Sequence, residues 1–222
     1  MQGQQAEVAW TEGVPVSVRF DDPYYSKADG LSETRHVFVA GNELPARFRP
    51  GFAVAELGFG TGLTLAVMRR TWREAGIDAP LRFTSFEAFP MPVPEMRAAL
   101  DAFPGVVPVL EDVLAALEGG ATTFNAPDLT FELILGDARE TLPRWEGQAD
   151  AWCLDGFSPA KNPELWDPDL MAEVARHTAP GGSFATYTAA GHVRRALAAA
   201  GFEVTRIPGF GRKRHMSVGR LP

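Results

Sequence analysis

The sequence predicts an α/β protein in which helices cover both faces of a mostly parallel sheet, forming a three-layer sandwich. Short apolar runs of strand character alternate with segments of helical periodicity along the 222 residues. A glycine-rich turn follows the first central run, and acidic residues end several of the runs. This alternation is typical of parallel strands joined by crossover helices. We expect a single domain over residues 1–222, with 1–48 as a small N-terminal β extension packed on a core of 49–222.

Seven strands are expected in the central sheet. The first, at about 52–57, is an apolar run that leads into the glycine turn. The others are predicted at 81–87, 131–135, 149–154, 183–188, 202–206 and 214–219. Helices are predicted from 63 to 72, 94 to 102, 109 to 118 and 163 to 177, and through Val193 and Leu197. In the N-terminal extension, the alternating residues Val14, Val16, Val18 and Phe20 and the run Val37-Phe38-Val39 predict short strands.

Composition limits the class of protein. A hydrophobic content of 45% and a charged content of 22% are ordinary for a globular protein. No apolar run is long enough to span a bilayer, and the polar start of the chain is unlike a signal peptide, so we expect a cytoplasmic protein without membrane contact. Cys153 is the only cysteine, which fits a reducing compartment. The four histidines are scattered, so no metal site is expected.

The charge distribution is uneven. A formal net charge of −7 argues weakly against nonspecific coating of nucleic acid. Residues 190–222, however, hold seven Lys or Arg against Glu203 alone, a local net of +6 that leaves −13 for the remainder. Such a segment is a candidate surface for a phosphate backbone. The alternative is a general preference for arginine, because the chain has 18 Arg and 3 Lys.

The turn Gly58-Phe59-Gly60-Thr61-Gly62 carries glycines at alternate positions directly after a predicted strand. Glycine lets backbone approach a ligand closely, and such turns hold nucleotides at the start of a helix. The spacing differs from the G-x-G-x-x-G of dinucleotide-binding proteins, and Glu56 stands where it would repel a phosphate. The pattern therefore favours a cationic or hydroxyl-bearing ligand, with a plain glycine-rich turn as the alternative.

Four predicted strands end at or near an acid. Ligands of open α/β sheets bind beyond the carboxyl ends of the strands, so acids at several neighbouring ends are expected to meet in one crevice. A solvated loop acid is the alternative for any one of them alone. The four are Glu56, Glu87, Asp137 and Asp155.

The pattern E-x-G-x-G-x-G at Glu56–Gly62 resembles the first motif of class I S-adenosylmethionine-dependent methyltransferases, which have a Rossmann-like fold. Longer segments resemble the methyltransferase part of the MnmC family, which acts on the wobble uridine of bacterial tRNA. That resemblance extends over about residues 16–219. The segments are Phe20-Asp21-Asp22 with Tyr24-Tyr25-Ser26, Gly30 to Arg35 with Val37-Phe38, Glu56 to Gly62, Asp155 to Trp166, and Gly209 to Arg214.

The resemblance implies S-adenosylmethionine as the cofactor, without metal or flavin. Glu87 matches the acid that accepts hydrogen bonds from both ribose hydroxyls, and Asp137 matches the position near the adenine amino group. A nicotinamide cofactor would explain Glu87 equally well, but not Glu56 or the glycine spacing. The implied cofactor-binding residues are Glu56, Gly58, Phe59, Gly60, Thr61, Gly62, Glu87, Asp137 and Asp155.

The resemblance also implies a reaction. It is N-methylation of the 5-aminomethyl group of wobble 5-aminomethyl-2-thiouridine in tRNA, giving 5-methylaminomethyl-2-thiouridine. The partner is then the anticodon loop of tRNA, and an upstream enzyme of the same pathway forms the aminomethyl group. Because the chain ends at Pro222, we expect a stand-alone methyltransferase without the flavin-dependent oxidase domain of the bifunctional members.

Asp155 is the expected catalytic residue, because a carboxylate can accept a proton or orient an amine lone pair. Helix capping is the alternative for this aspartate. A splayed wobble base can stack on Tyr25 or Phe157, although core packing explains Phe157 equally well. Basic side chains are expected to hold phosphates of the loop. These are Lys161, Arg194, Arg195, Arg212, Lys213 and Arg214.

Other functions fit parts of the pattern. A class I methyltransferase for a small amine or another RNA would keep the cofactor residues and change only the acceptor. A nonenzymatic RNA-binding module on the same fold would have lost turnover, and the four acids together argue against it. An oxidoreductase with a nicotinamide cofactor is disfavoured by the glycine spacing.

Overall fold

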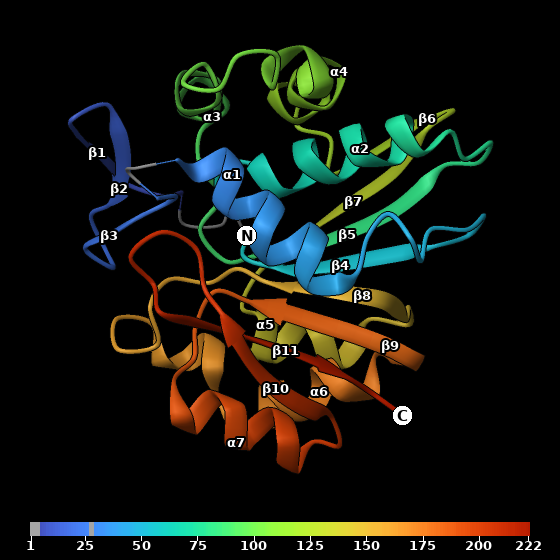
Figure 1. Cartoon of the computed structure of the whole chain (residues 1–222). Coiled ribbons are helices and arrows are strands. Elements are labelled where there is room, and N and C mark those ends of the chain that lie inside the picture. The colour runs from blue at the N-terminus through green and yellow to red at the C-terminus, as the bar shows by residue number, and fades with distance from the viewer. Residues whose placement is uncertain (1–4, 27–28) are drawn as a thin grey trace.

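The structure, a computed structural model, describes residues 5–26 and 29–222. Within these residues lies an eight-stranded sheet with strand order β10-β11-β9-β8-β4-β5-β7-β6 (Figure 1). The five strands β9-β8-β4-β5-β7 pair in parallel, while β6, β10 and β11 pair antiparallel. The strands are β4 (Ala53–Leu57), β5 (Leu81–Glu87), β6 (Thr123–Ala126), β7 (Leu129–Leu135), β8 (Ala149–Leu154), β9 (Thr178–Thr186), β10 (Glu203–Pro208) and β11 (His215–Arg220).

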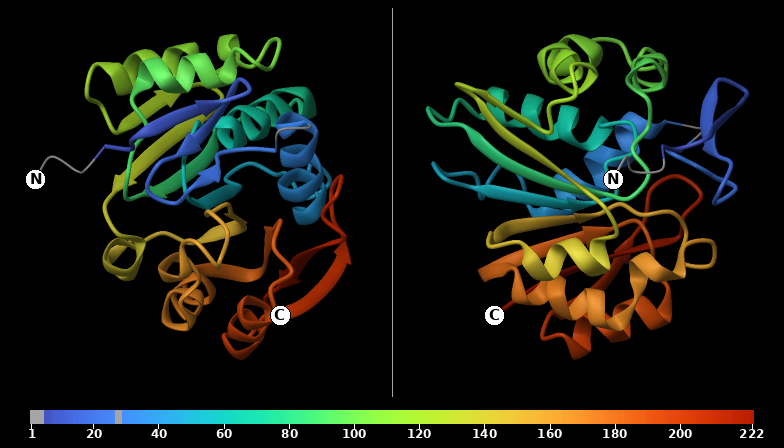
Figure 2. Two further views of the ribbon diagram at one scale, coloured as in Figure 1. Left: turned by 90° about the vertical axis from the view of Figure 1, so that its left-hand side faces the viewer. Right: turned by 180° about the vertical axis from the view of Figure 1, so that it is seen from behind.

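Helices cover both faces of this sheet, as the two views of Figure 2 show. One face carries α1 (Gly30–Thr34), α2 (Leu63–Ala75), α3 (Val93–Leu100) and α4 (Val107–Glu118). The other face carries α5 (Ala138–Thr141), α6 (Pro168–Arg176) and α7 (Gly191–Ala199). Short helical turns at Arg35–Val39, Ala40–Asn42, Leu142–Arg144 and Pro163–Trp166 connect these elements.

Burial on both faces explains why the central strands are apolar almost throughout. All five residues of β4 are buried, as expected for a parallel strand with helices on either side. The core between the sheet and α2 includes Leu65, Phe83 and Phe131, and the core on the opposite face includes Trp152 and Phe184. The predicted three-layer fold with a mostly parallel sheet is therefore confirmed.

A second, smaller sheet forms the predicted N-terminal extension. Its antiparallel strands are β1 (Val8–Thr11), β2 (Val14–Ser17) and β3 (Asp22–Pro23). The backbone N–H of Ser158 donates to Asp22 Oδ2 at 2.9 Å, so the extension is tied to the loop that follows β8. This contact holds the chain around residues 17–26 at the carboxyl ends of the parallel strands.

Several details differ from the sequence prediction. Val18 and Phe20 lie beyond the end of β2, and the helix expected at 163–177 is divided into a short turn and α6. The run Val37-Phe38-Val39 is helical rather than extended, because it continues the helix that Asp29 caps by accepting from the Ser32 N–H. All three side chains are buried in this helical turn, as they would be in a buried strand. The apolar sequence alone therefore does not distinguish the two structures. The main sheet has one strand more than the seven expected, because Thr123–Ala126 forms a hairpin with β7 at the sheet edge.

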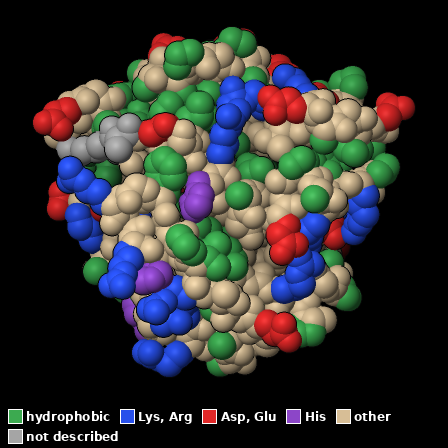
Figure 3. All heavy atoms as spheres, in the orientation of Figure 1, with side chains coloured by type: hydrophobic (Ala, Val, Ile, Leu, Met, Phe, Trp, Pro, Cys, Tyr) green, Lys and Arg blue, Asp and Glu red, His purple; other side chains and the backbone are tan. Residues whose placement is uncertain are grey.

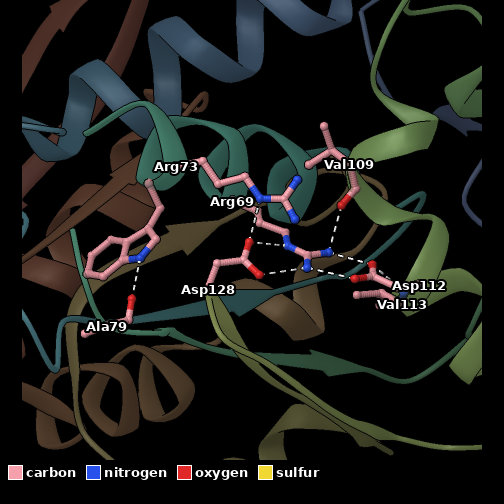
Figure 4. A network of polar contacts seen from close by, with 8 residues as sticks. Arg69, Arg73, Ala79, Val109, Asp112, Val113 and Asp128 are labelled. Atoms are coloured by element: carbon pink, nitrogen blue, oxygen red, sulfur yellow. Dashed lines mark hydrogen bonds and ion pairs between the residues drawn. The ribbon is translucent and has the colours of Figure 1, made fainter. Parts of the chain in front are cut away.

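A buried arginine joins α2, α4 and the β6–β7 turn (Figure 4). The Arg69 side chain is 1% exposed, and its guanidinium makes two bonds each to the carboxylates of Asp112 and Asp128, at 2.6 to 3.0 Å. A fifth bond reaches the Val109 carbonyl at 2.8 Å. Every donor nitrogen thus has a partner, which a buried guanidinium requires. The same arginine lowers the pKa of both carboxyls.

Arg69→Met is expected to lower the free energy of unfolding by about 2–4 kcal/mol at pH 7, because two carboxylates lose a buried partner. Arg73→Met is the matched control, since Arg73 is 43% exposed and its ion pair among the described residues is with Asp128, and it should cost no more than about 1 kcal/mol. Carboxyl groups with lowered pKa stabilise the fold above the unfolded-state pKa near 3.8, and this contribution disappears as the pH falls. Denaturant unfolding at pH 7 and pH 2.5 should therefore show a smaller difference between wild type and Arg69→Met at the lower pH.

Candidate cofactor and acceptor site

A cleft of about 1090 Å³ opens beyond the carboxyl ends of β4, β5, β7 and β8. This is the place where open α/β sheets bind ligands. Residues of the N-terminal extension and of α1 form its outer wall. The cleft brings together most of the predicted site residues: Tyr25, Gly58, Phe59, Gly60, Thr61, Glu87, Asp137, Asp155, Phe157, Lys161 and Lys213. Glu56, Gly62, Arg194, Arg195, Arg212 and Arg214 do not line it.

The glycine turn packs directly against the backbone that follows β8. Gly58 has φ +89°, and a Cβ built on it would lie 2.6 Å from the Asp155 carbonyl oxygen. The Asp155 N–H donates to the Leu57 carbonyl at 3.0 Å, which continues the pairing of β4 with β8. Only glycine fits such a close approach in this backbone conformation. The turn and the Asp155 loop are therefore held in fixed register.

Glu87 is fixed at the end of β5 by backbone amides. Its Oε1 accepts from the Phe89 N–H at 2.8 Å, and its Oε2 accepts from the Gly60 N–H at 3.1 Å. Burial raises the pKa of this carboxyl, while the amide hydrogen bonds act in the opposite direction. The second bond links the acid to the glycine turn, so both features predicted for cofactor binding form one unit.

Asp137 follows β7 and caps the short helix α5. Its Oδ1 accepts from the Arg139 N–H at 2.9 Å, and its Oδ2 lies 2.6 Å from Arg139 Nη2. The Arg139 guanidinium lowers the pKa of the Asp137 carboxyl, so this acid is ionised at neutral pH. It supplies a negatively charged acceptor at the β7 side of the cleft.

Asp155 is partly exposed to the cleft at the end of β8. Thr64 Oγ1, from the first turn of α2, donates to its Oδ2 at 3.1 Å. Burial raises the pKa of Asp155 to about 7, and the negative charge of Glu33 adds to this increase. The hydrogen bond from Thr64 and the positive charge of Lys213 act in the opposite direction. A carboxyl group that titrates near neutrality is suited to accept a proton at physiological pH.

Lys213 reaches the cleft from the loop between β10 and β11. Its Nζ lies 2.9 Å from Glu33 Oε1 of α1 and 4.0 Å from the centre of the Tyr187 ring. The Tyr187 hydroxyl in turn donates to the Gly156 carbonyl at 2.8 Å. Lys213 was predicted to hold tRNA phosphates, and in this structure it connects two sides of the cleft.

Aromatic rings gather around Phe157 at the outer end of the cleft. Phe20 stacks on Phe157 with ring centres 4.9 Å apart, and Tyr24 meets the same ring edge-on at 5.0 Å. Phe89 adds an edge contact to Phe20. Phe157 thus packs against other rings and also lines the cleft. Tyr25 lies apart from this group, with its hydroxyl donating to the Ala99 carbonyl.

The other predicted cations do not gather at one place. Lys161 is bound by the extension, where its Nζ contacts the Asp21 carbonyl and lies 3.6 Å from Asp22 Oδ1. Other cations surround His215, whose pKa is lowered by desolvation and by nearby arginines. Figure 3 shows Lys and Arg side chains gathered over α7 and the β10–β11 loop. The arginines near His215 are Arg194, Arg206 and Arg214.

Glu56 and Gly62 lie beneath the cleft surface. Glu56 is 0% exposed within β4, and its Oε2 accepts from Ser85 Oγ of β5 at 2.6 Å. Gly62 begins α2 with φ +81°, packed between Phe59 and α3 and α4 side chains. Both residues shape the floor of the site from below.

The residues present fit S-adenosylmethionine. That molecule offers a sulfonium cation, an ammonium group, two ribose hydroxyls and an adenine amino group, all of which favour acceptors or anions. The cleft presents carboxylates at the ends of three parallel strands, Glu87, Asp137 and Asp155, beside a turn whose glycines leave the backbone accessible. Among the described residues no cluster of His, Cys, Asp and Glu has the arrangement of a metal site.

Sequence reasoning did not assign roles to several residues of the site. Phe20, Tyr24 and Glu33 stand within segments that carry the family resemblance, and that was the one signal for them. Thr64, Phe89 and Tyr187 carried none, although Thr64 lies two residues after Gly62 and Phe89 two residues after Glu87.

The fold and the cleft define an α/β enzyme for a nucleoside-type cofactor. A model of the family described as S-adenosyl-L-methionine-dependent methyltransferase matches residues 106–222. The chain belongs to this family, so the predicted cofactor, S-adenosylmethionine, is confirmed.

Two relatives are bifunctional MnmC proteins of tRNA 5-methylaminomethyl-2-thiouridine biosynthesis. The protein of Chromobacterium violaceum is 43% identical over 99% of this chain and 35% of its own length. The protein of Caulobacter sp. is 46% identical over 91% of this chain and 36% of its own length. The chain thus spans about a third of the curated relatives it matches, and the resemblance to the MnmC family is confirmed.

Solved structures agree with the fold. The crystal structure of MNMC2 from Aquifex aeolicus matches with a TM-score of 0.79 and 26% identity, over 99% of this chain and 72% of that chain. Spermidine synthase from Thermotoga maritima matches with a TM-score of 0.56 at 9% identity, over 97% of this chain and 71% of that chain, which concerns the fold alone. In the part of the chain that the structure describes, no helix has the length and apolar character to cross a membrane.

Gly58→Ala is expected to destabilise the protein and to abolish measurable cofactor binding, because the added Cβ would displace the Asp155 backbone. Gly51→Ala is the matched control: Gly51 also has positive φ, at +81°, but open space around it. Both variants carry the backbone cost of roughly 1–2 kcal/mol. Thermal unfolding and calorimetric titration with S-adenosylmethionine should show a further loss in Gly58→Ala alone. Equal effects in the two variants would mean that the close packing is unimportant.

Proposed function

We propose that this chain transfers the methyl group of S-adenosylmethionine to the amino group of 5-aminomethyl-2-thiouridine at the wobble position of tRNA. The product is 5-methylaminomethyl-2-thiouridine, the nucleoside in the names of the relatives. The observation that carries the proposal is the position of Asp155, a carboxyl that faces the cleft beside the glycine turn. Burial raises its pKa to about 7. Action on tRNA would take place in the cytoplasm, after another enzyme has formed the aminomethyl group.

The reaction needs a neutral amine, because an ammonium has no lone pair to attack with. For an amine with a pKa near ~10.4, holding it neutral at pH 7 costs roughly 4.6 kcal/mol. Asp155 can take up this proton, and the partly enclosed cleft disfavours the charged ammonium. When bound, the cofactor supplies an electrophilic methyl group on a positively charged sulfur.

The aromatic group around Phe157 suits a base taken out of a single-stranded loop. A splayed nucleobase can insert beside an aromatic ring without breaking a duplex. Phe157 and Tyr24 both line the cleft near Asp155, and Lys161 fixes the extension that carries Tyr24. These rings would exclude water from the reacting amine.

The arginines near His215, together with Arg212, form the proposed surface for phosphates of the anticodon stem and loop. Arg212 and Arg214 are exposed and lie next to Lys213, which lines the cleft. A phosphate backbone held there would run towards the acceptor site, which is the arrangement that phosphate contacts provide in RNA-binding proteins.

Asp155→Asn should reduce turnover by about 10²- to 10⁴-fold, because the amide keeps the shape of the side chain but accepts no proton at neutral pH. Affinity for S-adenosylmethionine should stay within a few-fold. The assay incubates the protein and cofactor with tRNA that carries the aminomethyl nucleoside and identifies nucleosides by mass. Asp169→Asn, at an exposed position of α6, is the control that should leave the rate unchanged.

This assay also separates the alternatives. Wild-type protein that binds the cofactor but forms no methylaminomethyl product would exclude the proposed acceptor. Methylation of free small amines at a rate equal to that of tRNA would instead indicate a small-molecule methyltransferase. Binding of tRNA without any transfer would indicate a nonenzymatic RNA-binding module.

Replacing both Arg212 and Arg214 by Ser should weaken tRNA binding and flatten its dependence on salt. Each lost phosphate contact reduces the slope of log affinity against log salt concentration by roughly 0.7. Arg82→Ser is the control, because Arg82 is exposed near the opposite end of β5. Filter binding between 50 and 300 mM salt measures the slopes. An unchanged slope in the double variant would remove this surface from the tRNA interface.

A further inference from the structure

Glu56 is a fully buried acid for which methyl transfer provides no obvious use. It lies in the middle layer of the molecule, on β4, between the strands that end at Glu87 and Asp155. Its Oε2 accepts one hydrogen bond, from Ser85, and its Oε1 makes none among the described residues. An ionised carboxylate has about four acceptor sites, so a single donor in a fully buried place leaves its charge poorly compensated.

The groups around Glu56 add further negative charge. Burial raises its pKa well above the usual value, and the Asp155 and Glu87 carboxyls raise it further, while the Ser85 and Thr64 hydroxyls oppose this. Cys153 is the remaining titratable neighbour, and its own pKa is raised by burial and by these acids. No described cation is paired with Glu56.

Asp155 has a more favourable environment for its charge than Glu56. It is partly exposed to the cleft and accepts a hydrogen bond from Thr64. The Lys213 ammonium lowers the pKa of Asp155, whereas the Glu33 carboxylate raises it. Tyr187 also faces it and is itself kept neutral, because burial and the nearby acids raise its pKa. When two buried carboxyls lie close together, the proton resides on the less solvated one. Here that one is Glu56.

The Thr64 hydroxyl connects the two acids. It donates its hydrogen to Asp155 Oδ2 at 3.1 Å. The same hydroxyl is close enough to Glu56 to lower the pKa of that carboxyl, although Glu56 Oε1 has no hydrogen-bond partner among the described residues. A hydroxyl that donates one hydrogen can still accept two. A proton on Oε1 of Glu56 would give this unpartnered oxygen a hydrogen to donate, with Thr64 Oγ1 as the acceptor.

We propose that Glu56 is held as a neutral carboxylic acid that donates to Thr64, and that Thr64 in turn donates to Asp155. Glu56 is then a positioning residue: it orients the Thr64 hydroxyl, which keeps the Asp155 carboxylate ionised and turned towards the acceptor amine. This role differs from the cofactor contact expected from its place in the sequence motif, and it agrees with the absence of Glu56 from the cleft lining. The kinetic part of the proposal rests on the proposed methyl transfer.

Four variants separate this role from simple packing. Glu56→Gln keeps a neutral donor of the same shape, so the acid limb of the pH profile of kcat/KM should stay in place and the rate should fall less than about 3-fold. Glu56→Leu and Thr64→Val break the chain of donors, so the limb should move to higher pH by roughly half a unit or more. Thr64→Ser restores the hydroxyl and should return the limb to its wild-type position.

A measurement that needs no substrate completes the test. In protein labelled with carbon-13 at the Glu and Asp carboxyls, resonances are assigned by their loss in Glu56→Gln and Asp155→Asn. Glu56 should show the shift of a neutral acid at pH 7, while Asp155 should titrate near pH 7. Thr64→Val should raise the Asp155 midpoint, and Glu56→Gln should leave it unchanged.

The proposal is overturned if Glu56 titrates near the ordinary glutamate pKa of about 4.3. It is also overturned if Glu56→Gln lowers the Asp155 midpoint by a unit or more, because such a change would mean that Glu56 carries a negative charge. It is also overturned if Thr64→Val leaves that midpoint in place. Failure of the proposed function looks different: the carboxyl resonances would behave as described, but wild-type protein would form no methylaminomethyl nucleoside.

Discussion

The close packing of β4 on β8 at their carboxyl ends is the constraint on which the rest of the site depends. Gly58 lies so near the Asp155 carbonyl that no side chain fits between the two strands. The glycine turn and the loop that follows β8 are therefore parts of one backbone unit. Small errors in the placement of reacting groups are costly in catalysis, and a shared backbone contact limits such errors more effectively than two flexible loops could.

Desolvation is the second physical theme of the site. The desolvation that raises the pKa of Asp155 also raises the pKa of Glu56 and of Glu87. The negative charge of each acid is stabilised by different groups. Glu87 accepts from two backbone amides, and Asp155 accepts from the Thr64 hydroxyl and lies in the field of the Lys213 cation. Glu56 accepts from the Ser85 hydroxyl at Oε2. These differences separate the proton affinities of chemically similar groups, which is how acid and base roles are divided in many enzymes.

Much of this arrangement could be predicted from the sequence. The order of strands and helices follows from apolar runs and turn residues, and the acids at strand ends follow from the rule that ligands bind beyond the carboxyl edge of the sheet. The position of Glu56 could not be predicted in the same way, because in a strand buried on both faces the alternation of side chains does not distinguish cleft from core. The helical state of Val37 to Val39 was missed because buried helices and buried strands have the same apolar character. Arg69 was missed as a structural centre because its partners, Asp112 and Asp128, lie more than 40 residues away.

The contact between Ser158 and Asp22 has a consequence for the order in which the molecule folds. It joins segments 136 residues apart. The contacts of Phe20 and Tyr24 with Phe157 join the same two segments. Contacts of such long sequence separation form late, because closing a large loop costs entropy before the contact is made. The bond between the Gly60 N–H and Glu87, in contrast, joins two strands that are consecutive in the sequence. The contacts of Phe20, Tyr24 and Asp22 with the loop after β8 are therefore expected to form last and to open first, so that local unfolding there would expose the Phe157 side of the cleft.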